Sequence, residues 1–302
     1  MRKILLIIFF LTTYFALYAQ QDPLISIYQF NQLMLNPAYA GMHTNMSLSM
    51  HSRAQWIGIE GAPVTSILSG HAAMHKNKVG AGAWLSYDQF GVYRNTEFYT
   101  AYSYKIRLDD WQLSMGVQGG ITSYRTDFSK INLEYDDDPV LLGVIDNLSR
   151  PNFGAGVIMN NERVFFGLSV PKILNTKLEE ESASLLRAKR HYYLSAGVVL
   201  VPSTFVKLKL ATLMRMVEEQ PASLDFSATM IIGETIWAGL YTRNLNTAGL
   251  YAQFEISQTL RAGYAFELAV NDLMYNNIGS HEIMLSLDLV PFSFHYFKRR
   301  YF

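Results

Sequence analysis

The sequence has no cysteine, no excess of charge of either sign and, beyond its first residues, no long apolar run. Without cysteine, disulfide frameworks, thiolate metal sites and cysteine nucleophiles are excluded. The 25 Lys and Arg residues balance 25 Asp and Glu residues. No long basic tract is present, which argues against nucleic acid as a partner, because neutralising phosphates needs clustered positive charge. A mean hydropathy of +0.07 is too low for a polytopic helical membrane protein.

The N-terminus has the pattern of a secretory signal peptide. A charged Met-Arg-Lys start is followed by an apolar stretch over residues 4–18 and by Ala19, a plausible residue before a cleavage site. A single anchor helix is the alternative, but the apolar run is short for the roughly 20 residues that span a bilayer. We therefore expect residues 1–19 to be removed and the exported chain to begin near residue 20.

From Met46 onward, apolar and polar residues alternate with period two, as in strands whose two faces meet different surroundings. Phe98 and Tyr102 share one face, for example, whereas Lys105 lies on the other. Such runs are about ten residues long, which matches a tilted strand crossing a bilayer and exceeds the usual soluble strand. Marking them predicts about fourteen strands, over residues 46–54, 64–75, 79–88, 95–106, 111–122, 153–159, 163–170, 192–200, 204–213, 222–232, 235–244, 247–256, 259–269 and 280–289.

The placement of charge favours a membrane barrel. From residue 64 onward, the apolar faces of these runs carry no Asp, Glu, Lys or Arg. The opposite faces are rich in Gly, Ser, Thr, Tyr and Gln, as expected of a barrel lumen. A soluble β-sandwich also alternates, with its apolar face buried against a second sheet, and stays open as an alternative.

Loop lengths agree with the barrel. Counted from a periplasmic N-terminus, the connections on that side are tight, whereas most on the other side are long, including 123–152, 171–191 and 270–279. Short periplasmic turns and long external loops are typical of outer-membrane barrels. We expect an all-β fold, a transmembrane antiparallel up-and-down β-barrel of about fourteen strands over residues 46–302, in the outer membrane.

One turn fixes a cross-strand register. A three-residue turn at 257–259 carries the apolar face from Ile256 to Leu260 without a change of parity. This register sets Glu255 opposite Arg261 inside the barrel, and we predict an ion pair between them.

Candidates for metal binding or catalysis are weak. His71 and His75 sit in a strand, where four residues span about 13 Å, so they cannot chelate one metal. Asp136-Asp137-Asp138 suggests calcium, but without surrounding ligand spacing a solvated loop is the better interpretation. Ser195 as a nucleophile with His191 as its general base is a faint candidate for a catalytic site. We expect no enzymatic activity, no cofactor and no metal.

The segment over residues 20–45 differs from the rest. It contains the turn-rich hexapeptide Asn36-Pro37-Ala38-Tyr39-Ala40-Gly41. A barrel of about fourteen strands has room inside for chain, so we interpret this segment as a plug or a periplasmic docking piece. An ordinary lead-in to the first strand is the alternative. Gly80-Ala81-Gly82 and Gly116 to Gly120 resemble fragments of nucleotide loops, but no helix follows them, and lumen-facing glycines explain them better.

Four blocks together resemble the PorP/SprF family of type IX secretion system outer-membrane proteins: residues 22–41, Arg53-Ala54-Gln55-Trp56, Gly61-Ala62-Pro63-Val64-Thr65 and residues 279–285. The resemblance covers effectively the whole mature chain. It implies an integral outer-membrane component of the secretion machinery, in some members tied to gliding motility and to exporting or retaining a partner adhesin. The motif match marks as candidates Asn36, Pro37, Ala38, Tyr39, Gly41, Arg53, Gln55, Trp56, Gly61 and Pro63.

Two hypotheses follow for the barrel. In the first, it is a non-enzymatic interaction protein whose partners are other secretion subunits, a secreted surface protein such as an adhesin, and outer-membrane lipid. Its external loops carry specificity, and its lumen is crowded with paired charges and Tyr, with no continuous open pore. In the second, it transports small hydrophobic molecules, and so resembles fourteen-stranded fatty-acid channels with an N-terminal hatch.

Overall fold

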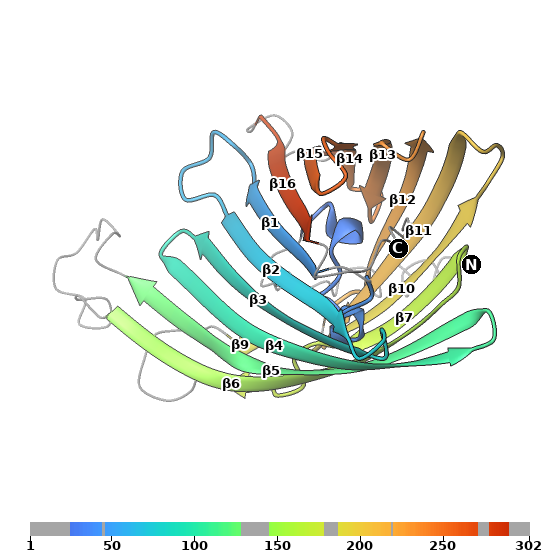
Figure 1. The fold of residues 1–302 in the computed structure, drawn as a ribbon. Coiled ribbons are helices and arrows are strands. Elements are labelled where there is room, and N and C mark those ends of the chain that lie inside the picture. The colour runs from blue at the N-terminus through green and yellow to red at the C-terminus, as the bar shows by residue number, and fades with distance from the viewer. Residues whose placement is uncertain are drawn as a thin grey trace, which may run out of the picture.

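The computed structural model describes residues 25–43, 46–127, 145–177, 187–218, 220–270 and 278–289. Fourteen strands form one closed antiparallel barrel, in which β1 pairs with β2 on one side and with β16 on the other (Figure 1). The predicted architecture and strand number are confirmed. Neither of the two short 3₁₀ helices among these residues, η1 (Tyr28–Phe30) and η2 (Pro37–Tyr39), is long and apolar enough to cross a membrane.

Every predicted strand is present. The barrel strands are β1 (Met46–Ala54), β2 (Val64–Met74), β3 (Val79–Phe90), β4 (Tyr93–Leu108), β5 (Trp111–Asp127), β6 (Ile145–Asn160), β7 (Val164–Val170), β10 (His191–Leu200), β11 (Val206–Val217), β12 (Ser223–Ile232), β13 (Ile236–Arg243), β14 (Thr247–Glu255), β15 (Leu260–Ala269) and β16 (Ser280–Leu289). The two-residue strands β8 (Thr176–Lys177) and β9 (Arg187–Ala188) pair separately.

The predicted loop 123–152 is wrong at both ends. β5 continues to Asp127 and β6 begins at Ile145, and the two strands stay paired over this extension. The alternation fades there because outward side chains such as Asn147 and Ser149 are polar and exposed, as expected beyond the apolar band, whereas the backbone ladder needs no such pattern. The hydrophobic pattern therefore marked only the lipid-level part of these strands.

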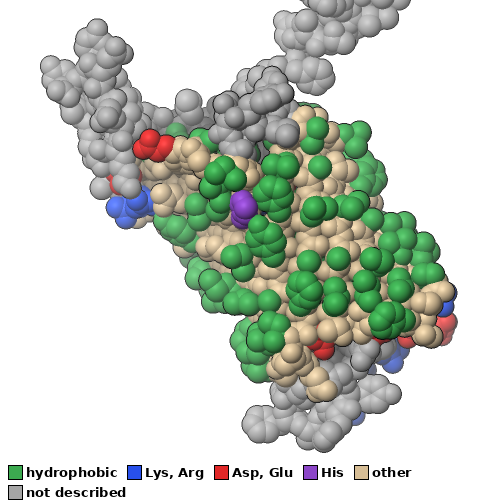
Figure 2. Space-filling view, turned by 90° about the horizontal axis from the view of Figure 1, so that it is seen from above, with side chains coloured by type: hydrophobic (Ala, Val, Ile, Leu, Met, Phe, Trp, Pro, Cys, Tyr) green, Lys and Arg blue, Asp and Glu red, His purple; other side chains and the backbone are tan. Residues whose placement is uncertain are grey.

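The outer face of the barrel is apolar and the inner face is polar. On β4, Phe98 and Tyr102 point outward and are about half exposed, whereas Glu97, Ser103 and Lys105 point inward and are buried. Figure 2 shows apolar side chains spread over the outer surface, with Lys, Arg, Asp and Glu at its margins. This inverts the arrangement of a soluble protein and is the one expected for a wall in contact with lipid.

Candidate functional site

The described N-terminal residues 25–43, here called the plug, lie inside the barrel (Figure 1). Their apolar side chains join three buried clusters with the wall. The clusters combine Leu33, Ala38, Tyr39 and Ala40 with Trp84, Tyr99, Ala101 and Ile158; Ile25 and Ile27 with Ile67, Tyr241, Tyr251, Ala265 and Met284; and Tyr28 and Leu35 with Tyr193 and Leu213. Hydrogen bonds that the plug accepts from Arg53, Ser114, Ser169 and Thr229 add β1, β5, β7 and β12. Every barrel strand is thus linked to the plug.

Asn36, the first residue of the hexapeptide, fixes the plug locally and to the wall. Its side-chain oxygen accepts a hydrogen bond from the N–H of Ala38 at 3.0 Å, so it caps η2, which begins at Pro37. Its side-chain nitrogen donates to the carbonyls of Val157 on β6 and Leu168 on β7, both at 3.2 Å. Asn36 therefore needs both its oxygen and its nitrogen, which no apolar residue could replace.

The wall also binds the backbone of the plug. The hydroxyls of Ser169, Ser114 and Ser103 donate to the carbonyls of Leu35, Ala38 and Ala40, each at 2.7 Å. The ammonium group of Lys105 donates to the carbonyl of Gly41. Since these carbonyls are buried from water, the bonds remove a cost of about 1–3 kcal/mol per unpaired group.

Glycines of the wall form a seat for the hexapeptide. A Cβ added at Gly80 would lie 2.0 Å from the oxygen of Ala40, one at Gly116 would lie 2.3 Å from the nitrogen of Ala38, and one at Gly156 would lie 2.1 Å from Oδ1 of Asn36. Contacts this close do not occur with real Cβ atoms. Any side chain at Gly80 or Gly116 would therefore displace the backbone of the seated plug, and one at Gly156 would displace the side chain of Asn36.

Gly41 closes the hexapeptide for two reasons. Its φ of +60° lies in the left-handed region, which favours glycine. A Cβ there would also lie 2.6 Å from the Cα of Gly80. The end of the plug thus passes β3 backbone against backbone.

Arg53 ties the start of the plug to the barrel closure. It lies opposite Glu282 in the β1 and β16 register, and its guanidinium contacts Glu267 at 2.6 Å and Glu282 at 3.4 Å. It also donates to the hydroxyl of Ser26. Ser26 in turn donates to Glu282 through its N–H at 2.7 Å and to Glu267 through its hydroxyl at 2.9 Å. All four side chains are buried, so each charge depends on its partners.

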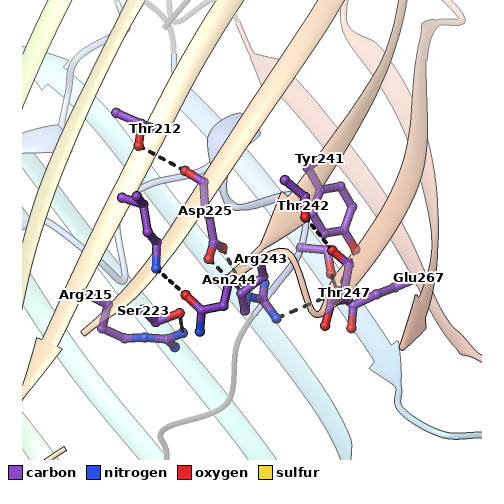
Figure 3. A network of polar contacts seen from close by, with 12 residues as sticks. Thr212, Arg215, Ser223, Asp225, Tyr241, Thr242, Arg243, Asn244, Thr247 and Glu267 are labelled. Carbon is purple, nitrogen blue, oxygen red and sulfur yellow. Dashed lines mark hydrogen bonds and ion pairs between the residues drawn. The ribbon is translucent and has the colours of Figure 1, made fainter. Parts of the chain in front are cut away.

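The charge network continues around the wall to β12. Arg243 contacts Asp225 at 3.1 Å and Glu267 at 3.7 Å, and the Tyr241 hydroxyl donates to Glu267 at 2.7 Å. Figure 3 shows Asp225 of β12, Arg243 of β13 and Glu267 of β15 pointing toward one another. A lumen of paired charges and Tyr, as the first hypothesis predicts, is therefore present.

At the opposite end of the plug, a chain of polar contacts leads to β16. The Tyr39 hydroxyl contacts Nε2 of His43 at 3.1 Å, and Nδ1 of His43 contacts the Ser47 hydroxyl at 3.3 Å. Ser47 donates to Asp288, which also receives a hydrogen bond from Arg261 of β15. The plug is thus held by polar networks at both ends, at Ser26 near the strand ends that the β1–β2 connection joins and at His43 near the opposite strand ends.

The predicted lumen ion pair needs a correction. The register is confirmed, because Glu255 lies opposite Arg261. However, Arg261 forms its ion pair with Asp288, and Glu255 is exposed. Asp288 is buried, so a cation must compensate for the hydration that its carboxylate has lost. Glu255 lies at the end of β14, where its carboxylate stays hydrated.

The remaining motif residues lie elsewhere, in the connection between β1 and β2. The N–H of Gln55 donates to the carbonyl of Pro63 at 2.9 Å, and the N–H of Trp56 donates to the Ser280 hydroxyl at 3.3 Å. Trp56 and Gly61 have positive φ, at 45° and 74°. The structure therefore divides the motif candidates into a buried plug group with Arg53 and a group in the β1–β2 connection, and it does not bring the two groups together.

The weaker chemical candidates do not assemble into a site. His71 packs against Tyr39 and His43, with ring centroids 5.3 and 5.1 Å apart, while His75 lies in the following turn. Four residues of β10, about 13 Å, separate His191 from Ser195. Over the described ranges, no group of three His, Asp or Glu residues could hold a metal ion. Asp136-Asp137-Asp138 lies outside the described residues, as does the predicted signal peptide.

Sequence reasoning missed the partners of the motif residues: Ser26, Glu267, Glu282 and the glycine seat as a unit. Glu282 was within reach, because it belongs to a quoted motif block and lies on a polar face. Its binding partner could not be predicted, because Glu282 and Ser26 are 256 positions apart in the sequence.

A closed antiparallel barrel with an apolar outside and a charged, occupied lumen defines an integral membrane barrel of the outer-membrane type. The family model "Type IX secretion system membrane protein PorP/SprF" matches residues 17–287. The chain belongs to this family, and it is a multi-pass protein of the outer membrane. A comparison with curated proteins found no match.

Comparison with solved structures finds other outer-membrane barrels. A Pseudomonas aeruginosa FadL homologue has a TM-score of 0.50 at 11% identity and covers 89% of this chain and 94% of its own. The Pseudomonas putida toluene transporter TodX has a TM-score of 0.47 at 8% identity, with 85% and 91% covered. The KdgM porin has a TM-score of 0.39 at 8% identity, with 82% and 99% covered. At these identities the likeness concerns the barrel alone.

Proposed function

We propose that this protein is a non-enzymatic outer-membrane component of type IX secretion that helps export or retain one secreted surface protein, such as an adhesin. The observation that carries the proposal is the anchored plug, which every barrel strand contacts. A partner protein has no path through a lumen occupied in this way. The barrel then acts as a scaffold, with the partner bound on the external side and other secretion subunits on the periplasmic side.

The division of the chain belongs to the same proposal. Residues 1–19 act as a signal peptide and are removed, residues 20–45 supply the plug, and residues 46–302 supply the barrel. External connections carry partner specificity, because loops on a rigid scaffold are where binding usually lies. The motif residues between β1 and β2, including Trp56 and Pro63, are on this external side.

Deletion of the gene tests the proposal. We expect one surface protein to disappear from the surface proteome, and spreading on agar to fail if that protein is a gliding adhesin. Permeability to small antibiotics stays unchanged, because a plugged barrel contributes no open pore. Re-expression of the wild-type chain restores display. A deletion strain with a normal surface proteome would refute the proposal.

A second candidate function is transport of small hydrophobic molecules. The observation in its favour is an apolar hollow of about 1150 Å³ on the outer wall, lined by β7 and β10 to β15, with Phe166, Leu210 and Leu250 among its outward side chains. Uptake of a labelled fatty acid into vesicles separates the two candidates. The scaffold function predicts no uptake above that of empty vesicles.

A further inference from the structure

β6 is much longer than the strand beside it. It pairs with β5 along its whole length, from Ile145 to Asn160, whereas β7 pairs with β6 only over Ala155–Asn160. Residues 145–152 therefore have β5 on one side and, among the described residues, no backbone partner on the other. We call this open side the β6 edge.

The hydrogen bonds of Phe153 show which backbone groups face this edge. Its carbonyl accepts from the N–H of Ile173 at 2.8 Å, and its own N–H donates to the side chain of Asn152 at 2.9 Å. Neither group bonds to β5, so both point to the other side. The segment after β7 thus pairs with Phe153, and the open part of the edge consists of the residues of β6 that precede Phe153.

The same direction holds for every second residue. In an antiparallel strand, residues of one parity turn both N–H and C=O to the same neighbour, so Ile145, Asn147, Ser149 and Pro151 face the open side. Pro151 has no N–H, and prolines within sheets are confined to such edge positions. One of these carbonyls, that of Ser149, accepts from the exposed guanidinium of Arg150 at 3.4 Å.

The β6 edge lies above the lipid. Going from Asn160 back toward the start of β6, Phe153 is the last large apolar side chain that points outward among those the structure describes, and it is 58% exposed. The outward side chains that follow, Ser149 and Asn147, are polar and exposed. An open sheet edge is not tolerated in hydrocarbon, but in water its unpaired groups are hydrated. The edge is therefore on the external, aqueous side of the wall.

We propose that an extended segment of the exported surface protein docks on the β6 edge as an added β-strand. The inference rests on the proposed function and says where and how the partner is held. A row of unpaired N–H and C=O groups is a template for another strand and recognises backbone. Arg150 beside the row favours an acidic side chain on the docked segment.

Pro151 and Arg150 also limit what can dock. Without an N–H at Pro151, the ladder is complete only from residue 145 to residue 149, about 13 Å of strand. Proline and charge on an edge suppress indiscriminate pairing. The docked segment is therefore short, and it carries no proline at the positions that pair with Asn147 and Ser149.

Backbone substitutions test the docking. In the deletion strain, Asn147→Pro and Ser149→Pro each remove one edge-facing N–H, while Asn147→Ala and Ser149→Ala keep it. The probe is the surface protein that the deletion strain loses. We expect each proline variant to lower its retention about fivefold, the effect of one backbone hydrogen bond, and the alanine variants to stay near wild type. Heat-modifiable migration on gels and the amount in outer membranes check folding.

Hydrogen exchange of the purified full-length protein in detergent supplies a second readout. The amides of Asn147 and Ser149 are expected to exchange fast, because no residue that the structure describes pairs with them. Slow exchange in the isolated protein would overturn the docking proposal. Full retention by both proline variants would overturn it while leaving the proposed function standing. A deletion strain that loses no surface protein would overturn both.

Discussion

Substitution of Gly116 should release the plug. A Cβ at this position would lie 2.3 Å from the nitrogen of Ala38 and 2.4 Å from the carbonyl carbon of Pro37. Ordinary contact begins at 3.4 Å, so Gly116→Ala requires the plug to shift by about 1 Å. Both obstructing atoms are backbone and cannot rotate away. Overpacking of this kind costs about 1–3 kcal/mol, which raises the population with a displaced plug roughly 5- to 150-fold.

Thiol labelling measures that population, because the chain has no cysteine of its own. Leu33→Cys places one reporter thiol in a plug side chain that is fully buried. Its reaction with a water-soluble maleimide in detergent should be slow in the parent and at least about fivefold faster with Gly116→Ala, since labelling follows the open population.

A matched control lies on the same strand. Gly119 faces outward, and a Cβ there would meet only the movable ring of Phe153, at 3.2 Å. Gly119→Ala should therefore leave the labelling of Leu33→Cys unchanged. Equal labelling rates in the Gly116→Ala and Gly119→Ala proteins, both folded, would refute the seat.

Three further substitutions probe the networks, each by the temperature at which the folded band is lost on gels. Arg53→Met leaves buried carboxylates such as Glu267 without their main cation and should destabilise the barrel by about 3–5 kcal/mol; a loss under 1 kcal/mol would contradict the network. Asn36→Ala removes a helix cap and two bonds to the wall, with an expected loss of about 1–3 kcal/mol and faster labelling of plug thiols. Asp288→Asn should lower the free energy of unfolding several times more than Glu255→Gln does. The loss for Glu255→Gln is expected to stay within about 0.5 kcal/mol, because that carboxylate is hydrated. Equal losses for the two variants would support the ion pair between Glu255 and Arg261 instead.

The division of the motif candidates has a consequence for mutagenesis. Asn36, Ala38 and Tyr39 are at most 3% exposed and contact the lumen wall. Variants there act first on the seating of the plug, and loss of partner display in them is indirect. Trp56 and Gly61 lie in the connection between β1 and β2, which the proposed function assigns to the external side, so variants there are the better test of direct partner contact.

Strand number, inward and outward faces, and local register were all determined by the sequence itself. A strand has a period of two residues, and lipid on one side with a polar lumen on the other forces that period into the composition. Turn length fixes parity between consecutive strands, which is why Glu255 was placed opposite Arg261 correctly. All of these relations concern neighbours in the chain.

Which residues come into contact across the lumen, and which backbone groups stay open at the rim of the barrel, depends on the folded structure. Arg53 pairs with Glu267 and Glu282, and not with other inward-facing acidic residues, because closure of β1 against β16 brings these side chains together. The two glutamates are 214 and 229 residues away from Arg53 in the sequence. The glycine seat exists only because the hexapeptide, residues 36–41, crosses β3, β5 and β6 at glycines. The β6 edge arises from unequal ladder lengths above the lipid, where no hydrophobic pattern records how far a strand continues. Distant contacts and hydrated backbone leave no periodic trace, so the folded chain alone establishes them.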